Sequence, residues 1–144
     1  MKKILIVDDD PLITTVYAKH FRADGFDVRV ASSGQAGLDE VRSFLPDAVL
    51  LDLHMPGVNG VQWLDEIRKD ARFANLPVTV FTAGEIGWQL WAARNSNVNF
   101  IFKEGAQPLG VVRAINAVLA MAAGPPPAAS RTPAADAAGR MRTP

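Results

Sequence analysis

Short apolar runs, rich in β-branched residues, alternate along the first 123 residues with longer stretches in which apolar positions recur every three or four residues. The short runs predict strands and the longer stretches predict helices. Most of the short runs are apolar at consecutive positions, as expected for a parallel sheet that helices cover on both faces. The predicted strands are Lys3–Val7, Asp27–Val30, Ala48–Leu51, Val78–Phe81 and Asn99–Phe102. The pattern therefore predicts an α/β fold.

Capping residues indicate where the intervening helices begin and end. Asp10 is the expected N-cap of the first helix, Pro11 occupies its first position, and Gly25 ends it. The remaining helices are expected from Ser32 or Ser33 to about Leu45, after Asn59 as N-cap, over Glu85–Asn95 and over Pro108–Ala122. No internal sequence repeat is visible, so the five strand and helix units form one domain.

The composition changes after Ala123. Residues 124–144 contain five of the ten prolines and six alanines, but no aromatic residue and no Val, Ile or Leu. Such a segment cannot bury enough apolar surface to offset the entropy of ordering it. We therefore expect a folded domain over residues 1–123 and a disordered tail or linker over residues 124–144.

Charge and cysteine content indicate which partners and which cellular compartment to expect. The 15 basic and 15 acidic side chains cancel, and no basic block indicates binding to nucleic acid or to an anionic membrane. No apolar run approaches the roughly 18 residues of a membrane-spanning helix, and the run after Lys3 is too short for a signal peptide. The absence of cysteine is typical of a reducing compartment. We expect a cytoplasmic protein that binds neither nucleic acid nor a membrane.

Chemically active side chains follow four of the five predicted strands. Ligands of open parallel sheets bind beyond the carboxyl ends of the strands, so these positions are the candidate site. They are Asp8, Asp9 and Asp10 after the first strand, Asp52 after the third, Thr82 after the fourth and Lys103 after the fifth. If these strands are neighbours, the side chains converge at one edge of the sheet.

Carboxylates crowded at one edge repel one another unless a cation lies among them. Oxygen ligands without cysteine or clustered histidine favour Mg²⁺ or a similar ion. Asp52 could then act as a nucleophile that forms an aspartyl phosphate, while the Lys103 ammonium neutralises the phosphoryl oxygens. The Thr82 hydroxyl could donate a hydrogen bond to the same group. The residues therefore predict phosphoryl transfer onto Asp52.

Four segments carry a resemblance to a known family: LIVDDDP, VLLDLHMPGVNG, VFTAG and NFIFK. They resemble the receiver domains of two-component response regulators, over about residues 2 to 121. The resemblance implies a flavodoxin-like, doubly wound sheet of order 2-1-3-4-5. It also implies Mg²⁺ bound by Asp8, Asp9, Asp52 and the backbone carbonyl of His54, phosphoryl transfer to Asp52 with Thr82 and Lys103, and a switch formed by Thr82 and Phe100.

The resemblance also implies partners. Asp52 would receive its phosphoryl group from a sensor histidine kinase or a phosphotransfer protein. An output protein would bind through the fourth helix, the fifth strand and the fifth helix. The protein would then be a signalling switch that catalyses only its own phosphorylation and dephosphorylation, and not an enzyme with another substrate.

Some residues depart from the family pattern and leave alternatives open. Glu104 follows Lys103 where these domains usually have proline, so we expect a trans peptide there, and its carboxylate could compete for the Lys103 ammonium. Trp88 and Trp91 on the fourth helix could be core or partner contacts. One alternative is a binding module of receiver fold that works without phosphate. Another is a haloacid dehalogenase-type phosphohydrolase, which His54 disfavours because those enzymes carry a second Asp at that position.

Overall fold

The computed structural model describes residues 1–83 and 98–122 of the chain. Five strands form one parallel sheet in the order β2-β1-β3-β4-β5, which confirms the order implied by the resemblance. The strands are β1 (Lys3–Val7), β2 (Asp27–Ala31), β3 (Ala48–Leu51), β4 (Val78–Thr82) and β5 (Val98–Phe102). The helix expected over Glu85–Asn95, with Trp88 and Trp91, and the tail expected over residues 124–144 lie outside the described residues.

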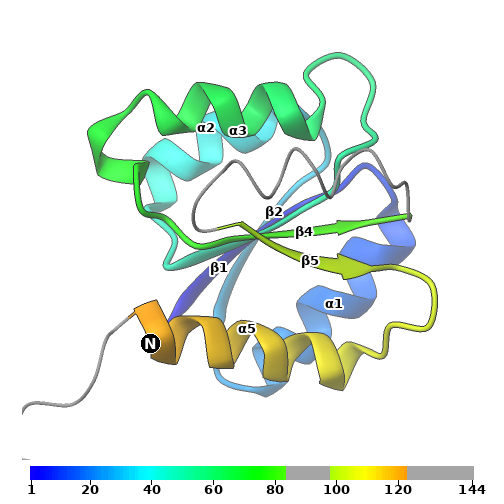
Figure 1. Cartoon of the computed structure of the whole chain (residues 1–144). Helices are drawn as coiled ribbons and strands as arrows, with labels where there is room; N and C mark the ends of the chain where they lie inside the picture. Colours follow the sequence, from blue (N-terminus) through cyan, green and yellow to red (C-terminus); the bar gives the residue numbers. More distant parts are fainter. Residues whose placement is uncertain (84–97, 123–144) are drawn as a thin grey trace, which may run out of the picture.

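Helices cover both faces of the sheet, so the fold has three layers (Figure 1). The described helices are α1 (Pro11–Ala23), α2 (Gly34–Phe44), α3 (Gly60–Arg68), the 3₁₀ helix η1 (Ala71–Phe73) and α5 (Pro108–Ala122). Helices α1 and α5 pack on one face and α2 and α3 on the other. Each face has its own core of buried apolar side chains. No helix within residues 1–83 and 98–122 is long and apolar enough to cross a membrane.

Helices α1, α2 and α3 begin at the N-cap residues expected from the sequence. The Asp10 carboxylate accepts a hydrogen bond from the Leu12 N–H, and the Ser33 hydroxyl accepts one from the Ala36 N–H. Asn59 and Gln62 form a reciprocal capping box at the start of α3. These side chains satisfy N–H groups that have no partner inside their helix. The first turns of α1, α2 and α3 are therefore fixed by local sequence.

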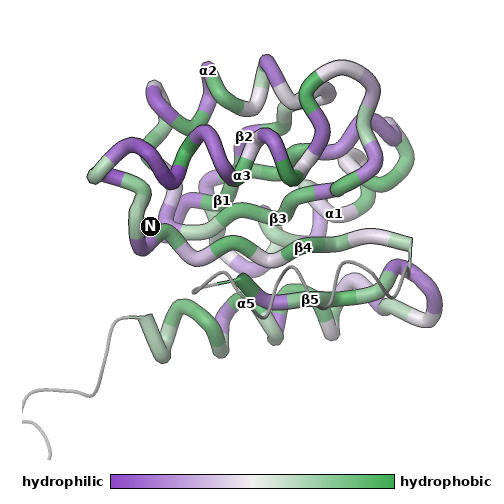
Figure 2. The backbone as a smooth tube through the Cα atoms, turned by 45° about the horizontal axis from the view of Figure 1, so that its top comes forward, coloured by the Kyte–Doolittle hydropathy of each residue, from purple (hydrophilic) through white to green (hydrophobic). Residues whose placement is uncertain are grey.

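The two edge strands are less buried than the sequence pattern suggested. Every residue of β3 and β4 is buried, whereas β2 and β5 each contain exposed residues. Strand β5 lies at the edge of the sheet, so Phe100 and Phe102 do not sit on a fully buried strand. Phe102 is 36% exposed and Phe100 is half-buried. In Figure 2 the described helices alternate between hydrophilic and hydrophobic positions along their length.

Helix η1 between α3 and β4 was not expected. Asp70 caps it by accepting a hydrogen bond from the Arg72 N–H. The Arg68 guanidinium donates hydrogen bonds to the backbone carbonyls of Phe73 and Leu76, at 2.7 and 2.8 Å. The side chain at the end of α3 thus supplies hydrogen-bond donors to this segment, and the periodicity of apolar residues gives no sign of it.

Candidate functional site

Backbone hydrogen bonds carry the sheet ladder one residue past its strands and so fix the candidate residues in place. The Asp8 N–H donates to the Ala31 carbonyl at 3.1 Å, and the Asp52 N–H donates to the Val7 carbonyl at 2.9 Å. On the other side of the sheet, the Lys103 N–H donates to the Thr82 carbonyl at 2.8 Å. Each functional side chain therefore starts from a rigid backbone position at the carboxyl edge.

Three carboxylates converge at this edge. One carboxylate oxygen from each of Asp8, Asp9 and Asp52 lies within 4.8 Å of the other two. Asp8 is 2% exposed and Asp52 is 4% exposed, while Asp9 is open to solvent. Two buried acids and one exposed acid offer hard oxygen donors of the kind that Mg²⁺ binds, and the exposed side leaves room for water ligands. The donor set fits a divalent cation.

Lys103 completes the charged cluster. Its ammonium nitrogen Nζ lies 3.0 Å from Asp8 Oδ2 and 3.6 Å from Asp52 Oδ1. Burial by itself lowers the pKa of Lys103, but the hydrogen bond and charge of Asp8 and the charge of Asp52 outweigh burial and raise it. Lys103 is therefore a cation at neutral pH, held between the two buried carboxylates.

The environment of Asp52 makes its carboxyl group unusually basic. Burial, first, and then the negative charge of Asp8 raise the pKa of Asp52 to about 6. The Lys103 ammonium and the backbone N–H of His54, which donates to Asp52 Oδ1 at 3.3 Å, act in the opposite direction. Burial and the charge of Asp8 both disfavour the ionised form of Asp52. A cation that binds beside this carboxylate therefore stabilises it.

Among the described residues, the Thr82 hydroxyl finds no hydrogen-bond partner. Thr82 is fully buried. Leaving a buried hydroxyl unpaired costs about 1 to 3 kcal/mol, so a new acceptor placed beside this hydroxyl would be stabilising. A phosphoryl oxygen on Asp52 is an acceptor of the kind that this hydroxyl lacks.

The residues proposed for the switch lie on neighbouring strands. In the parallel register of β4 and β5, Val80 pairs with Phe100 and Thr82 pairs with Phe102. The Phe100 and Phe102 rings lie 6.3 Å apart, which places both on one face of β5. The switch role of Phe100 stays a prediction.

His54, Asp10 and Glu104 surround the cluster. The His54 side chain is exposed, and the metal-binding role of its carbonyl stays a prediction. Asp10 caps α1, as expected, and its N–H donates to Asp8 Oδ1 at 2.9 Å. No described residue has a cis peptide bond, which confirms the trans peptide before Glu104. Competition between Glu104 and a phosphoryl group for Lys103 stays untested.

The sequence reasoning missed an aromatic pair beside the cluster, of which Phe81 faces Lys103 and Tyr17 of α1 packs against Phe81. The alternation of side chains in a strand places Phe81 on the opposite face from Thr82. Nothing local in the sequence shows that Lys103 reaches across β4 to that face.

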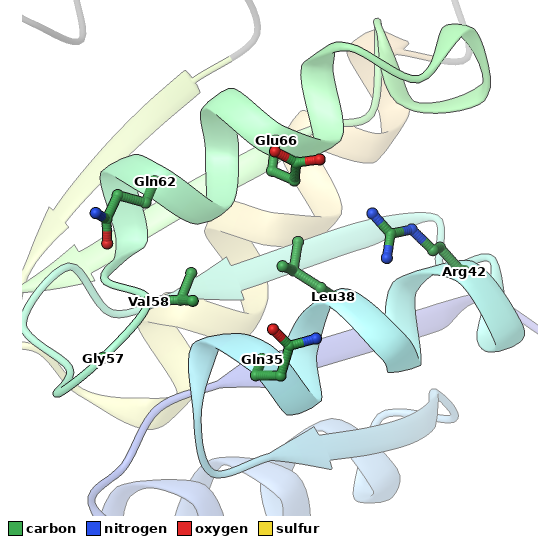
Figure 3. Close-up of a pocket in the computed structure, with 7 residues that line it drawn as sticks. All are labelled: Gln35, Leu38, Arg42, Gly57, Val58, Gln62 and Glu66. Atoms are coloured by element: carbon green, nitrogen blue, oxygen red, sulfur yellow. The ribbon is translucent and has the colours of Figure 1, made fainter.

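A groove of about 660 Å³ lies away from the cluster, between α2 and α3 (Figure 3). Gln35, Leu38 and Arg42 line it from α2, and Gln62 and Glu66 line it from α3. Gly57 and Val58 close one end. None of the clustered carboxylates lines this groove, so the groove and the charged site are separate features of the surface.

Comparison with known proteins identifies the family. Residues 4–109 match the family model described as the response regulator receiver domain. The chain belongs to this family. The protein is therefore a receiver domain of two-component signalling, which agrees with its fold and its acidic cluster.

Among related proteins, PilH of Pseudomonas aeruginosa is 34% identical to this receiver domain over 125 residues, which cover 83% of this chain and 99% of PilH. The DNA-binding response regulator MtrA of Mycolicibacterium smegmatis is 39% identical over 82 residues. That match covers 57% of this chain and 35% of MtrA, so the chain spans about a third of the length of this relative.

Solved structures share the fold. A putative response regulator from Chloroflexus aurantiacus superposes with a TM-score of 0.76 at 28% identity, covering 83% of this chain and 98% of that one. The chemotaxis protein CheY4 of Vibrio cholerae gives a TM-score of 0.76 at 19% identity, covering 82% of this chain and 98% of CheY4. At that identity the second likeness concerns the fold alone.

Proposed function

We propose that this receiver domain is a phosphorylation-dependent signalling switch in which Asp52 accepts a phosphoryl group from a histidine kinase or a phosphotransfer protein. The observation that carries the proposal is the convergence of Asp8, Asp9, Asp52 and Lys103 at one edge of the sheet. Three acids and one cation leave this edge with excess negative charge. A divalent cation offsets that excess, and phosphoryl transfer needs such a cation together with a nucleophile and an ammonium.

The side chains divide the work as follows. An Asp52 oxygen attacks phosphorus and forms the new P–O bond, while the bond between phosphorus and the donor nitrogen breaks and the histidine leaves. Lys103 neutralises charge on the phosphoryl oxygens, and the Thr82 hydroxyl donates to one of them. Mg²⁺ held by Asp8, Asp9, Asp52 and the His54 carbonyl would supply further charge neutralisation. The domain catalyses only its own phosphorylation and dephosphorylation in this proposal.

The same arrangement supports a switch. A phosphoryl group adds about −1.5 to −2 charge and three strong acceptors beside Thr82, whose hydroxyl has no partner within the described residues. Thr82 then moves toward Asp52, and Phe100 changes rotamer with it. An output protein reads this change at β5 and α5, together with the helix expected over Glu85–Asn95. Phe102 and Leu109 expose apolar surface there, at 36% and 54%.

Other expectations from the sequence also stay proposals. MtrA is named as DNA-binding, but its match to this chain covers only a third of MtrA, and the present chain has no basic block. We therefore expect output through a protein partner and not through nucleic acid or a membrane. The cytoplasmic location stays a prediction.

Phosphorylation by a small acyl phosphate tests the proposal. We expect intact-protein mass spectrometry to show one added phosphoryl group on the wild type after incubation with acetyl phosphate and Mg²⁺. Asp52→Asn should remain unlabelled, because its amide is not a nucleophile. Asp39→Asn is the matched control, since Asp39 is exposed on α2, and it should be labelled like the wild type.

Three outcomes contradict the switch. An unlabelled wild type supports the binding module that works without phosphate. Equal labelling of wild type and Asp52→Asn shows that another residue is the acceptor. Multiple turnovers of general phosphate esters, lost in Asp52→Asn, support the phosphohydrolase alternative instead.

A further inference from the structure

An aromatic pair lies beneath the charged cluster on the face covered by α1 and α5. Phe81 of β4 and Tyr17 of α1 are 1% and 4% exposed. Their ring centroids lie 5.0 Å apart with an angle of 59° between the ring planes. This tilted contact is within the range in which aromatic rings attract one another, so each ring restricts the other.

The Lys103 ammonium lies over this pair. Its Nζ is 5.7 Å from the centroid of the Phe81 ring, and the same nitrogen ion-pairs with Asp8 at 3.0 Å. A cation within about 6 Å of a ring centroid is attracted by the electron-rich face of the ring. Burial raises the pKa of the Tyr17 hydroxyl and the Lys103 charge partly lowers it, so Lys103 is near enough to act on the Tyr17 hydroxyl as well. The Phe81 ring and the Asp8 carboxylate thus both lie within interaction distance of the same ammonium.

We propose that Phe81, supported by Tyr17, is a positioning residue that holds the Lys103 ammonium at the carboxylates for phosphoryl transfer to Asp52. The inference rests on the proposed function and adds a residue to it. Lysine has a flexible four-carbon stem, and fixing its ammonium normally costs side-chain entropy. The Phe81 ring limits the positions open to Nζ and keeps water from the underside of the ion pair. Lys103 therefore stays in place when the phosphoryl oxygens on Asp52 compete with the Asp8 carboxylate for its ammonium.

The chain provides a matched control at the other end of the same core. Phe26 is 4% exposed and contacts Phe21 with ring centroids 5.1 Å apart. The Lys2 ammonium lies 5.3 Å from the Phe26 ring centroid. This second trio has the same chemistry but lies at the amino end of β1, away from the carboxylates. Phe26→Leu therefore removes a comparable core ring without affecting Lys103.

The experiment compares Phe81→Leu and Phe26→Leu in the full chain. We expect Phe81→Leu to lower the rate constant for phosphorylation by acetyl phosphate about fivefold, the scale of one cation–π contact, at saturating Mg²⁺. The Mg²⁺ dissociation constant, followed by tryptophan fluorescence, should change less than about twofold, because the carboxylates remain. Phe26→Leu should leave the rate constant within about twofold of wild type.

A double-mutant cycle separates positioning from a general loss of structure. Phe81→Leu should cause no further loss of rate in a Lys103→Met background, because the group that it positions is gone. The same fold-loss in both backgrounds, or a Phe81→Leu rate within about twofold of wild type, would overturn the inference. If Phe81→Leu does not fold, Phe81→Met replaces it, since Met has similar volume but no ring.

An NMR measurement tests the contact independently of phosphorylation. Protons on the Lys103 side chain should show an aromatic ring-current shift that Phe81→Leu abolishes and Phe26→Leu preserves. Persistence of the shift in Phe81→Leu overturns the inference even if acetyl phosphate fails to label the wild type. Failure of labelling by itself overturns only the proposed function.

Discussion

At the scale of single residues, the site combines ordinary side chains whose properties depend on burial. Asp52 is an unremarkable acid in the sequence, yet in the fold its pKa rises to about 6, because burial and Asp8 oppose its charge. Lys103 compensates for this only in part, since its ammonium lies between Asp8 and Asp52 and is shared by both. The ionised Asp52 carboxylate is therefore destabilised as long as no cation binds beside it and no phosphoryl group is attached to it.

The raised pKa of Asp52 predicts how the stability of Asp52→Asn, compared with wild type, depends on pH. Between the unfolded pKa of 3.8 and about 6, the native protein keeps a proton that the unfolded chain has lost, so the Asp52 contribution to stability falls as pH rises. Without Mg²⁺, Asp52→Asn should therefore be more stable than wild type by about 2 kcal/mol near neutral pH. Near about pH 4 the difference should be close to zero.

Urea denaturation of both proteins at the two pH values measures this difference. Mg²⁺ should reduce the advantage of the variant at neutral pH, because a bound cation stabilises the wild-type carboxylate. A stability difference of the same size at both pH values would contradict a raised pKa of Asp52 in the native protein.

At the scale of elements, close packing between α2, β1 and α3 holds the acidic edge in place. Gly37 of α2 is buried against Trp63 of α3 and Val7 of β1. A Cβ atom at Gly37 would lie 2.8 Å from Trp63 Nε1 and 2.9 Å from Val7 Cγ1. Val7 directly precedes Asp8, so the contact that fixes the helix also fixes the strand that carries the first acid.

Gly37→Ala and Gly110→Ala should therefore have opposite effects. Both positions are helical, but nothing lies within 4 Å of a Cβ atom at Gly110 in α5. We expect Gly110→Ala to raise the free energy of unfolding by about 0.5 to 1 kcal/mol through helix propensity. Gly37→Ala should lower it by about 1 to 3 kcal/mol because of overpacking. Thermal or urea unfolding measures both, and stabilisation by Gly37→Ala would show that α2 can shift without cost.

At the scale of the whole molecule, the order of the strands creates the site. Strands β1 and β3 are neighbours at the centre of the sheet, and β4 and β5 follow on one side. This order brings together acids that are separated by more than forty residues in the sequence, and it brings Lys103 to them from the edge strand. Two cores of buried apolar side chains, one on each face of the sheet, are formed by the described residues.

Deletion of residues 125–144 should leave the melting temperature within about 2 °C of that of the full chain. The reason is compositional, since the segment has almost no large apolar side chains to bury. Differential scanning calorimetry of the full and shortened chains measures the difference. A fall of several degrees would mean that the segment packs against the domain.

The sequence by itself determined the features that depend on local interactions. The bounds of β1 and β3 were predicted correctly, and Asp10, Ser33 and Asn59 cap their helices as expected. Hydrogen bonds of caps and the periodicity of side chains involve residues a few positions apart, so they can be predicted from the chain. The types of residue at the carboxyl edge also indicated phosphoryl chemistry before any distance was known.

The tertiary structure decided what depends on neighbours distant in the sequence. The pattern of apolar residues did not show that β5 lies at an edge with Phe102 exposed, and the resemblance, not the pattern, supplied the strand order. The pKa of Asp52 and the contact of Lys103 with Phe81 arise only when separate strands place these groups together. Burial and Coulomb interactions act through space, and the sequence gives the groups but not the distances between them.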